Sequence, residues 1–353
     1  MPFFASIGNL FGRVFGVKLP VIQGVVTTFA GSTTGGTNAT GTNSTFNGPY
    51  DIAMDLSGNM YVPEQTGCRI RKITPNAVVT TLAGSGSNTS IDGTGTNATF
   101  SLPFGVIVDT GGNVYVAENG GRLIRKITPA GVVTTLAGGT AGSTNGTGTN
   151  ARFFSPTGIT IDSASNLYVT DNQNHAIRKI TPAAVVTTFA GVSASTSFGY
   201  VDGTGTNAKF YLPTGIAIDS AGTLYVCDSY NHRIRKVSPT GVVTTLAGSA
   251  TGQGTATGAF ADGTGANASF NQPFGVEVDS EGTVYIGDRM NHRIRKITPA
   301  GVVTTIAGTS GVGGFADGTG GNARFNNPRG LAVTPAGVMY VADQTNQRIR
   351  KIV

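Results

Sequence analysis

The stretch Leu212-Pro-Thr-Gly-Ile-Ala-Ile-Asp219, followed after a Gly-Thr turn by Leu224-Tyr-Val-Cys-Asp228, decides the fold of this chain. A Ser-Tyr-Asn-His232 turn then leads to Arg233-Ile-Arg-Lys-Val237, and a Ser-Pro-Thr-Gly241 turn leads to Val242-Val-Thr-Thr-Leu-Ala-Gly248. Short runs of β-branched and aromatic residues, bounded by turn-forming residues, are typical of β-strands. The stretch therefore predicts four short strands, which we name a to d in chain order.

This unit recurs six times along the chain of 353 residues. Each copy keeps the same distance from the proline of strand a to the second arginine of strand c, for example from Pro49 to Arg71 and from Pro328 to Arg350. Strands a to c therefore have a constant length, and the length variation falls between strand d and the next proline. Fixed blades joined by variable loops are what radial repetition requires. We expect an all-β, six-bladed β-propeller with four antiparallel strands per blade.

The two ends of the repeat region predict how the ring closes. The sixth unit stops at Arg348-Ile-Arg-Lys-Ile-Val353 without a strand d, and the missing Val-Val-Thr-Thr-Phe-Ala-Gly occurs at residues 25–31. We expect this N-terminal strand to complete the last blade and to pair its free edge. The expected domains are an apolar arm over 1–20 and a propeller over 21–353.

The net charge of +6 is the first candidate sign of an anionic partner. However, 17 of the 24 basic residues lie in the six segments around the Arg-Lys step, and 15 of the 18 acids occupy three repeat positions, namely the ends of strands a and b and the Asp-Gly-Thr-Gly loop. This distribution favours pairing within the molecule. It argues against a nucleic-acid partner, because diffuse charge does not form a binding groove.

Several other classes are disfavoured by what the sequence lacks. Cys68 and Cys227 fall on nearly opposite blades, so we expect free thiols rather than a disulfide. The chain has neither an apolar run long enough to span a bilayer nor a recognisable signal peptide. The expected location is therefore the cytoplasm or an assembled particle.

The repeat resembles the NHL family in three features. These are the Pro-x-Gly-(Ile/Val) start of strand a, the Tyr-Val-x-Asp ending of strand b, and the Asn-His-Arg-Ile segments Asn231–Ile234 and Asn291–Ile294. The resemblance covers residues 25–353 and implies the same propeller fold. It implies no single function, because the family includes protein-binding, RNA-binding, sensor and lyase members.

Three histidines, His175, His232 and His292, test the lyase alternative because they occupy one equivalent position in blades three to five. The resemblance implies that NHL lyases acting on peptidyl-hydroxyglycines use a histidine at a matching position, together with two from Pro-His steps that enter strand a. Here no histidine follows any of the six prolines. Because zinc needs three or four converging ligands, we expect structural hydrogen bonding, with no metal and no cofactor.

A calcium-dependent lactonase would need several acids around the central channel. Only Asp51, in place of the strand-a glycine, and Glu277, in place of a small residue, depart from the repeat pattern there. We expect neighbouring Arg or Lys residues to pair with these two carboxylates. The sequence therefore predicts no catalytic residues.

The loops before strand a and between strands b and c share one face of a propeller, and the copies differ most there. Aromatic, methionine and arginine side chains on an otherwise Thr- and Asn-rich surface suit recognition of a partner or ligand. An alternative is that the aromatic residues merely plug the mouth of the channel. The predicted recognition residues are Tyr50, Phe104, Phe274, Arg329, Tyr230, Arg289 and Met290, with Gln65, Asn119, Gln173 and Gln344 at neighbouring positions.

The N-terminal arm carries large apolar residues at helical spacing, which predicts a short amphipathic helix or a docked arm. The arm could cover the propeller itself, insert into a protein partner, or lie on a membrane surface, and the sequence favours the membrane least. The apolar residues are Phe3, Phe4, Ile7, Leu10, Phe11, Val14 and Phe15.

These features favour a non-enzymatic binding or scaffold propeller. We expect a structural component of a larger assembly, such as a virion or a surface layer, attached through the arm and the variable loop face. The alternative is an NHL-type lyase or hydrolase with its site at the mouth of the central channel.

Overall fold

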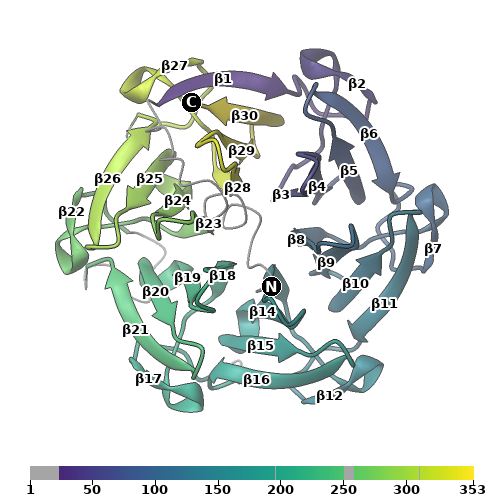
Figure 1. Cartoon of the computed structure of the whole chain (residues 1–353), viewed down its shortest axis with the longest axis vertical. Helices are drawn as coiled ribbons and strands as arrows, with labels where there is room; N and C mark the ends of the chain where they lie inside the picture. Colours follow the sequence, from purple (N-terminus) through teal and green to yellow (C-terminus); the bar gives the residue numbers. More distant parts are fainter. Residues whose placement is uncertain (1–23, 195, 250–257, 310) are drawn as a thin grey trace.

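The structure is a computed structural model that describes residues 24–194, 196–249, 258–309 and 311–353. These residues form six antiparallel sheets arranged radially around a central axis, as Figure 1 shows. The predicted six-bladed propeller is thus confirmed.

Strands a to d run from the channel to the rim in every blade. The innermost strands a are β3 (Ala53–Met54), β8 (Pro103–Val108), β13 (Pro156–Ile161), β18 (Pro213–Ile218), β23 (Pro273–Val278) and β28 (Pro328–Val333). Strands b are β4 (Met60–Glu64), β9 (Val114–Glu118), β14 (Leu167–Asp171), β19 (Leu224–Asp228), β24 (Val284–Asp288) and β29 (Met339–Asp343). Strands c are β5 (Arg69–Ile73), β10 (Leu123–Ile127), β15 (Ala176–Ile180), β20 (Arg233–Val237), β25 (Arg293–Ile297) and β30 (Arg348–Ile352). Strands d are β6 (Val78–Ala83), β11 (Val132–Gly138), β16 (Val185–Gly191), β21 (Val242–Ala247), β26 (Val302–Ala307) and β1 (Val25–Ala30).

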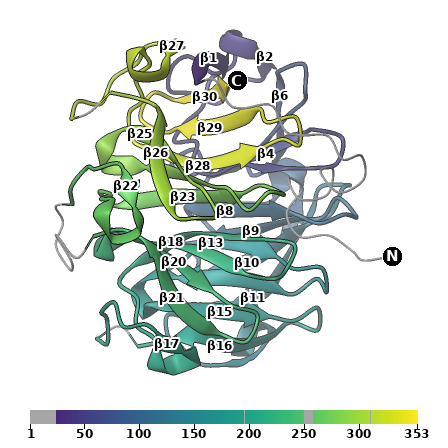
Figure 2. The same ribbon diagram turned by 60° about the vertical axis from the view of Figure 1, so that its left-hand side comes forward.

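The N-terminal strand completes the last blade, as predicted. Strand β1 pairs antiparallel with β30 in the register Val26 to Ile352. The backbone N–H groups of Val25 and Val353 each donate to the carbonyl oxygen of the other residue at 3.0 Å. Figures 1 and 2 show β1 beside β30 although the two strands lie at opposite ends of the repeat region. This pairing gives blade six the same strand order as the other blades.

Each sheet also contains a fifth strand, where the sequence predicted only four strands and the Asp-Gly-Thr-Gly loop. The Gly-Thr step of the Asp-Gly-Thr-Gly loop pairs for two residues with the outer side of strand d, and a 3-10 turn follows it. The short strands are β2 (Ala39–Thr40), β7 (Gly93–Thr94), β12 (Gly146–Thr147), β17 (Gly203–Thr204), β22 (Gly263–Thr264) and β27 (Gly318–Thr319). The 3-10 turns after them are η1 (Gly41–Asn43), η2 (Gly95–Asn97), η3 (Gly148–Asn150), η5 (Gly205–Asn207), η7 (Gly265–Asn267) and η9 (Gly320–Asn322).

Three further 3-10 turns connect strands b and c in blades three, four and five. They are η4 (Asn172–Asn174), η6 (Ser229–Asn231) and η8 (Arg289–Asn291). Each ends at a histidine in the left-handed region, with φ near 55°. This backbone turns the chain sharply into strand c.

The core lies between neighbouring blades. One cluster packs Tyr168 and Ile177 of blade three against Ile216 and Val226 of blade four. A fully buried phenylalanine stands three residues before each strand-a proline and contributes to these clusters. The six phenylalanines are Phe46, Phe100, Phe153, Phe210, Phe270 and Phe325.

The apolar arm of residues 3–15 lies outside the described residues. Within the described ranges, no helix has the length and hydropathy that crossing a membrane requires. Both cysteines, Cys68 and Cys227, are buried free thiols.

Candidate functional site

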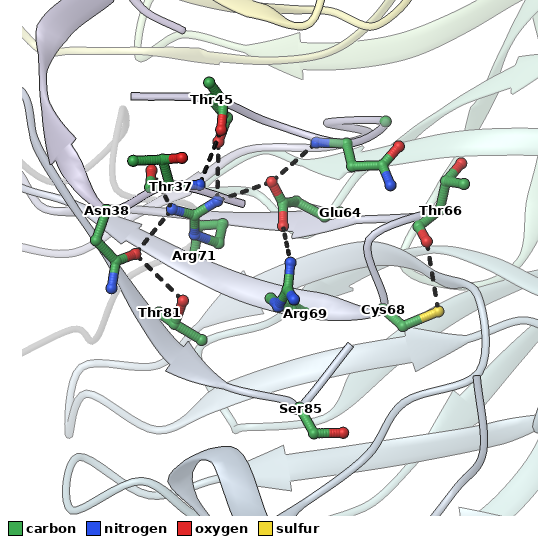
Figure 3. Close-up of polar contacts among 12 residues, drawn as sticks. Thr37, Asn38, Thr45, Glu64, Thr66, Cys68, Arg69, Arg71, Thr81 and Ser85 are labelled. Atoms are coloured by element: carbon green, nitrogen blue, oxygen red, sulfur yellow. Dashed lines mark hydrogen bonds and ion pairs between the residues drawn. The ribbon is translucent and has the colours of Figure 1, made fainter. Parts of the chain in front are cut away.

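The repeat arginine of strand c is buried and binds acids inside its own blade. In blade four, Arg235 donates to Asp228 Oδ2 at 2.8 Å and to Asp202 Oδ1 at 2.6 Å. In blade one the loop carries an amide instead, so Arg71 donates to Glu64 Oε1 at 2.9 Å and to Asn38 Oδ1 at 2.9 Å (Figure 3). The predicted internal pairing therefore holds for the acids of strand b and of the loop.

The acids at the end of strand a do not follow that prediction. Asp55 accepts hydrogen bonds from the backbone N–H groups of Ser57 and Asn59, both at 2.9 Å, and from the Tyr61 hydroxyl at 3.0 Å. The turn between strands a and b supplies enough N–H donors to satisfy the carboxylate locally. Among the described residues, no Arg or Lys forms an ion pair at this position.

The three histidines bind the backbone of the following blade. The Nδ1 atoms of His175, His232 and His292 accept hydrogen bonds from backbone N–H groups at 3.2, 3.0 and 3.1 Å. These donors belong to the segment before the next strand a, so each histidine links two blades. Structural hydrogen bonding is what the sequence predicted. Across the described ranges, no group of three or more His, Cys, Asp or Glu side chains is placed to hold a metal ion.

Five of the predicted recognition residues meet at the mouth of the central channel, and we call them the channel-mouth cluster: Tyr50, Phe104, Phe274, Arg289 and Arg329. The Tyr50 ring stacks on Phe104 at 4.2 Å between centroids and meets Phe274 edge-on at 5.1 Å. The Arg329 guanidinium lies 4.1 Å from the Tyr50 centroid and 4.6 Å from the Phe274 centroid. The three rings therefore pack together, and the arginine is stacked against two of them, Tyr50 and Phe274.

Polar side chains fix the two arginines in place. Arg329 Nε donates to Gln344 Oε1 at 3.0 Å, and Gln344 Nε2 donates to Gln65 Oε1 at 3.4 Å. Arg289 donates to Gln272 Oε1. Burial raises the pKa of Tyr50, an effect that the positive charges of Arg329 and Arg289 oppose. The cluster is thus a positively charged aromatic surface rather than a purely apolar plug.

Beside the cluster lies a hollow of about 310 Å³ on the side of blades two to five. Among the residues that the structure describes, its walls combine aromatic rings and neutral hydrogen-bonding groups with one arginine, and contain no carboxylate, imidazole or thiol. The residues of the hollow are Tyr50, Phe104, Asn119, Ser155, Thr157, Asn172, Gln173, Leu212, Thr214, Ser229, Tyr230, Phe274 and Arg289.

The hollow includes residues that the sequence analysis did not select. Thr157 and Thr214 follow the prolines of blades three and four, at the positions that hold Tyr50 and Phe104 in blades one and two. The shared position after the proline was therefore the signal that could have identified them. Met290, by contrast, is 40% exposed and does not line the hollow.

Asp51 lies in the channel beneath the cluster, where the other five blades carry glycine. A Cβ atom added to Gly275 would clash with the carbonyl oxygen of Arg329, so the inner strands approach too closely for a side chain. Blade one carries the aspartate at this position, and its strand a, β3, is limited to Ala53–Met54.

The partners of Asp51 differ from those expected. Its oxygens accept from the backbone N–H groups of Ile52 at 2.9 Å and Val106 at 3.1 Å, and no Arg or Lys of the described residues pairs with it. Burial raises the pKa of Asp51 to about 7, although the two N–H groups oppose the rise. The cavity that Asp51 lines has a volume of about 30 Å³, which is large enough to hold a water molecule.

The fold and its repeated blade define a six-bladed β-propeller, and comparison with known proteins defines the repeat. The NHL repeat model matches residues 210–237 and 325–352. NHL repeat-containing protein 2 of Homo sapiens is 32% identical over 295 residues, covering 71% of this chain and 39% of that protein. Protein SUPPRESSOR OF QUENCHING 1, chloroplastic, of Arabidopsis thaliana is 31% identical over 284 residues, covering 77% of this chain and 27% of that protein. The chain therefore belongs to the NHL-repeat propellers, and it spans less than half of these curated relatives.

Solved structures with the same fold are more distant in sequence. An auxiliary nutrient binding protein from Bacteroides thetaiotaomicron has a TM-score of 0.69 at 20% identity, with 93% of this chain and 76% of that chain covered. A virginiamycin B lyase from Staphylococcus aureus has a TM-score of 0.54 at 16% identity, with 86% and 80% covered. At these identities the similarity shows the fold alone.

Proposed function

We infer that this chain is a non-enzymatic recognition propeller whose ligand occupies the hollow at the channel mouth. The observation that carries this inference is the convergence of the departures from the repeat. Three aromatic rings and two arginines meet beside a hollow of about 310 Å³, within the usual size range of small-molecule sites.

The composition of the hollow favours binding over catalysis. A lyase or hydrolase needs a general acid or base, a nucleophile or a metal within reach of its substrate. Within the described ranges, no carboxylate, imidazole or thiol lines the hollow. The Nδ1 atoms of the three histidines already accept backbone hydrogen bonds between blades.

A thermal-shift screen tests this function on the full chain. The panel contains neutral sugars, sugar acids, carboxylates, phosphates and short peptides, each tested with the wild type, Tyr230→Ala and Tyr200→Ala. Tyr230 lines the hollow, whereas Tyr200 is an exposed rim residue and serves as the matched control. We expect at least one compound to raise the melting temperature of the wild type and of Tyr200→Ala but not of Tyr230→Ala.

The recovered compound is then analysed by mass spectrometry. Unchanged compound supports recognition without catalysis, whereas its conversion would favour the lyase or hydrolase alternative. The absence of any compound whose effect depends on Tyr230 would contradict the proposed site.

We also propose that the chain joins a larger assembly through residues 1–20. The arm carries seven large apolar side chains, and burying each is worth roughly 1.5–3 kcal/mol, which favours a covered position. Deletion of residues 1–18 with β1 retained should leave the melting temperature unchanged and abolish co-sedimentation with the native partner fraction. A truncated chain that loses stability and still co-sediments would show instead that the arm covers its own propeller.

A further inference from the structure

Arg289 and Arg329 differ from the repeat arginines because no carboxylate of the described residues pairs with them. Each stands at a position where the other five blades carry an uncharged residue. The ion pairs among the described residues join repeat arginines to repeat acids, and none includes either of these two. The channel mouth therefore holds two positive charges that no carboxylate in the described part of the chain neutralises.

The electrostatics of this pair favour a bound anion. A guanidinium stays protonated in proteins, so neither charge can be relieved by losing a proton. Burial lowers the pKa of both arginines, and the nearby charge of Arg329 lowers that of Arg289 further. Stacking on Tyr50 and Phe274 compensates part of the lost hydration of Arg329. Charge-assisted hydrogen bonds to an oxyanion would compensate both cations more strongly.

The neutral walls of the hollow favour a ligand rich in hydroxyl groups. Nine of the lining side chains are Asn, Gln, Ser, Thr or Tyr. Asn119 and Asn172 already donate from their amide nitrogens, to Ser155 Oγ at 2.6 Å and to Pro213 O at 2.9 Å. Their amide oxygens are acceptors, which suits hydroxyl donors on a ligand.

A row of aromatic rings leads from the hollow towards the rim of blade four. Tyr230 lines the hollow, and its centroid lies 5.4 Å from that of Tyr211. Phe198 stacks on Tyr211 at 4.2 Å and is 49% exposed. The electron-rich face of an aromatic ring attracts the C–H groups on the apolar face of a sugar ring. Three neighbouring aromatic side chains therefore favour a ligand with several sugar rings over a ligand with one.

We propose that the channel mouth binds an acidic oligosaccharide, in which the carboxylate of a uronic acid is held by Arg289 and Arg329 and the following sugar rings lie along Tyr230, Tyr211 and Phe198. The proposal rests on the proposed recognition function and names its ligand class. A peptide with a free C-terminal carboxylate would also meet the arginines. Its apolar side chains, however, would face amides and hydroxyls that would then lose their hydrogen-bonding partners.

Isothermal titration calorimetry with the full chain tests the ligand class. The compounds are the trimers and monomers of galacturonic, glucuronic and mannuronic acid, the neutral trimer of galactose, a tripeptide with a free C-terminus, and inorganic phosphate. We expect one uronic-acid trimer to bind at least about tenfold more tightly than the neutral trimer and the tripeptide, because hydrogen bonds to charged groups are the strongest in the site.

Variants then locate the carboxylate and the sugar chain. Arg289→Gln and Arg329→Gln should each weaken the acidic trimer about tenfold or more without changing the affinity for the neutral trimer. Phe198→Ala and Tyr211→Ala should weaken the trimer and leave the monomer unaffected. Arg152→Gln and Arg324→Gln remove exposed arginines elsewhere and serve as charge-matched controls. Melting curves confirm that each variant is folded, and Arg289→Lys replaces Arg289→Gln if the latter is not.

The outcomes separate this inference from the proposed function. Equal affinity for neutral and acidic trimers, or binding of only the tripeptide or phosphate, would overturn the acidic-sugar proposal. If that binding still depends on Tyr230, the recognition function stands. If no compound binds in a Tyr230-dependent manner, both proposals fail.

Discussion

Replacement of Asp51 should change how the stability of the propeller depends on pH. Burial in the channel raises the pKa of Asp51 from 3.8 to about 7. A rise of about three pH units, at about 1.4 kcal/mol each, corresponds to roughly 4 kcal/mol. Between about pH 4 and pH 7, Asp51 keeps its proton in the folded state, whereas in the unfolded chain it has already released it. Stability contributed by this group is therefore complete below about pH 4 and is lost as the pH rises to about 7.

Two variants isolate this contribution. Asp51→Asn keeps a side chain of similar size, and Asp51→Gly restores the residue of the other five blades. Asp51→Asn loses the acceptor for one of the N–H groups of Ile52 and Val106, whereas Asp51→Gly loses both acceptors. Each unsatisfied N–H group costs about 1–3 kcal/mol at every pH. Neither variant has the carboxyl group, so the pH-dependent part should be the same for both.

Urea denaturation of the three proteins between pH 4 and pH 8 measures the effect. All other titrating groups are shared, so they cancel in the difference between wild type and variant. Between pH 4 and pH 8, we expect the unfolding free energy of the wild type to fall by roughly 4 kcal/mol relative to that of either variant. A difference that stays constant within about 1 kcal/mol would refute the reasoning that the channel destabilises the ionised carboxylate.

Three further predictions concern the blades. Arg235→Met should lower the free energy of unfolding by about 3–5 kcal/mol in urea titrations, because Asp228 is left buried without its cation. His292→Phe should remove an inter-blade bond, and the stability advantage of the wild type over it should shrink as the pH falls below about 6.5, because burial, aided by Arg289, lowers the pKa of His292. Deletion of all residues through Ala30 should expose the edge of β30 and cause aggregation in size-exclusion chromatography, whereas a monomeric deletion variant with the wild-type melting temperature would contradict ring closure by β1.

The fold could be predicted from the sequence because its signals recur in every blade. The constant spacing between Pro49 and Arg71 is repeated five more times, and the strand missing after Val353 occurs at Val25. The fifth strand was missed because two residues carry no detectable alternation of apolar and polar side chains. The phenylalanine three residues before each proline was an equally regular signal, and the structure shows why: the buried guanidinium of strand c lies over its ring, at 5.2 Å for Arg235 and Phe210.

The candidate site was predicted only in part. Comparing equivalent positions identified Tyr50, Arg289 and Arg329, because each departs from its counterparts in the other blades. The same comparison could not show that Thr214 lines the hollow, because a threonine in a Thr-rich repeat does not stand out. It also could not show that Asp51 binds backbone N–H groups, since that depends on how closely two inner strands approach.

The paired contacts of the buried arginines have a consequence for how new surfaces can be added to this propeller. Arg235 of blade four donates hydrogen bonds to the carbonyl oxygen of Val201 and to the carboxylate of Asp202, in the segment that connects blade three to blade four. The part of the connecting segment before these contacts varies in length between the blades, and lengthening a flexible segment twofold costs only about 0.6 kcal/mol of closure entropy. Foreign peptides could therefore be inserted into these connecting segments. A library varied in the segments of several blades would present combined surfaces while the blades stay unaltered.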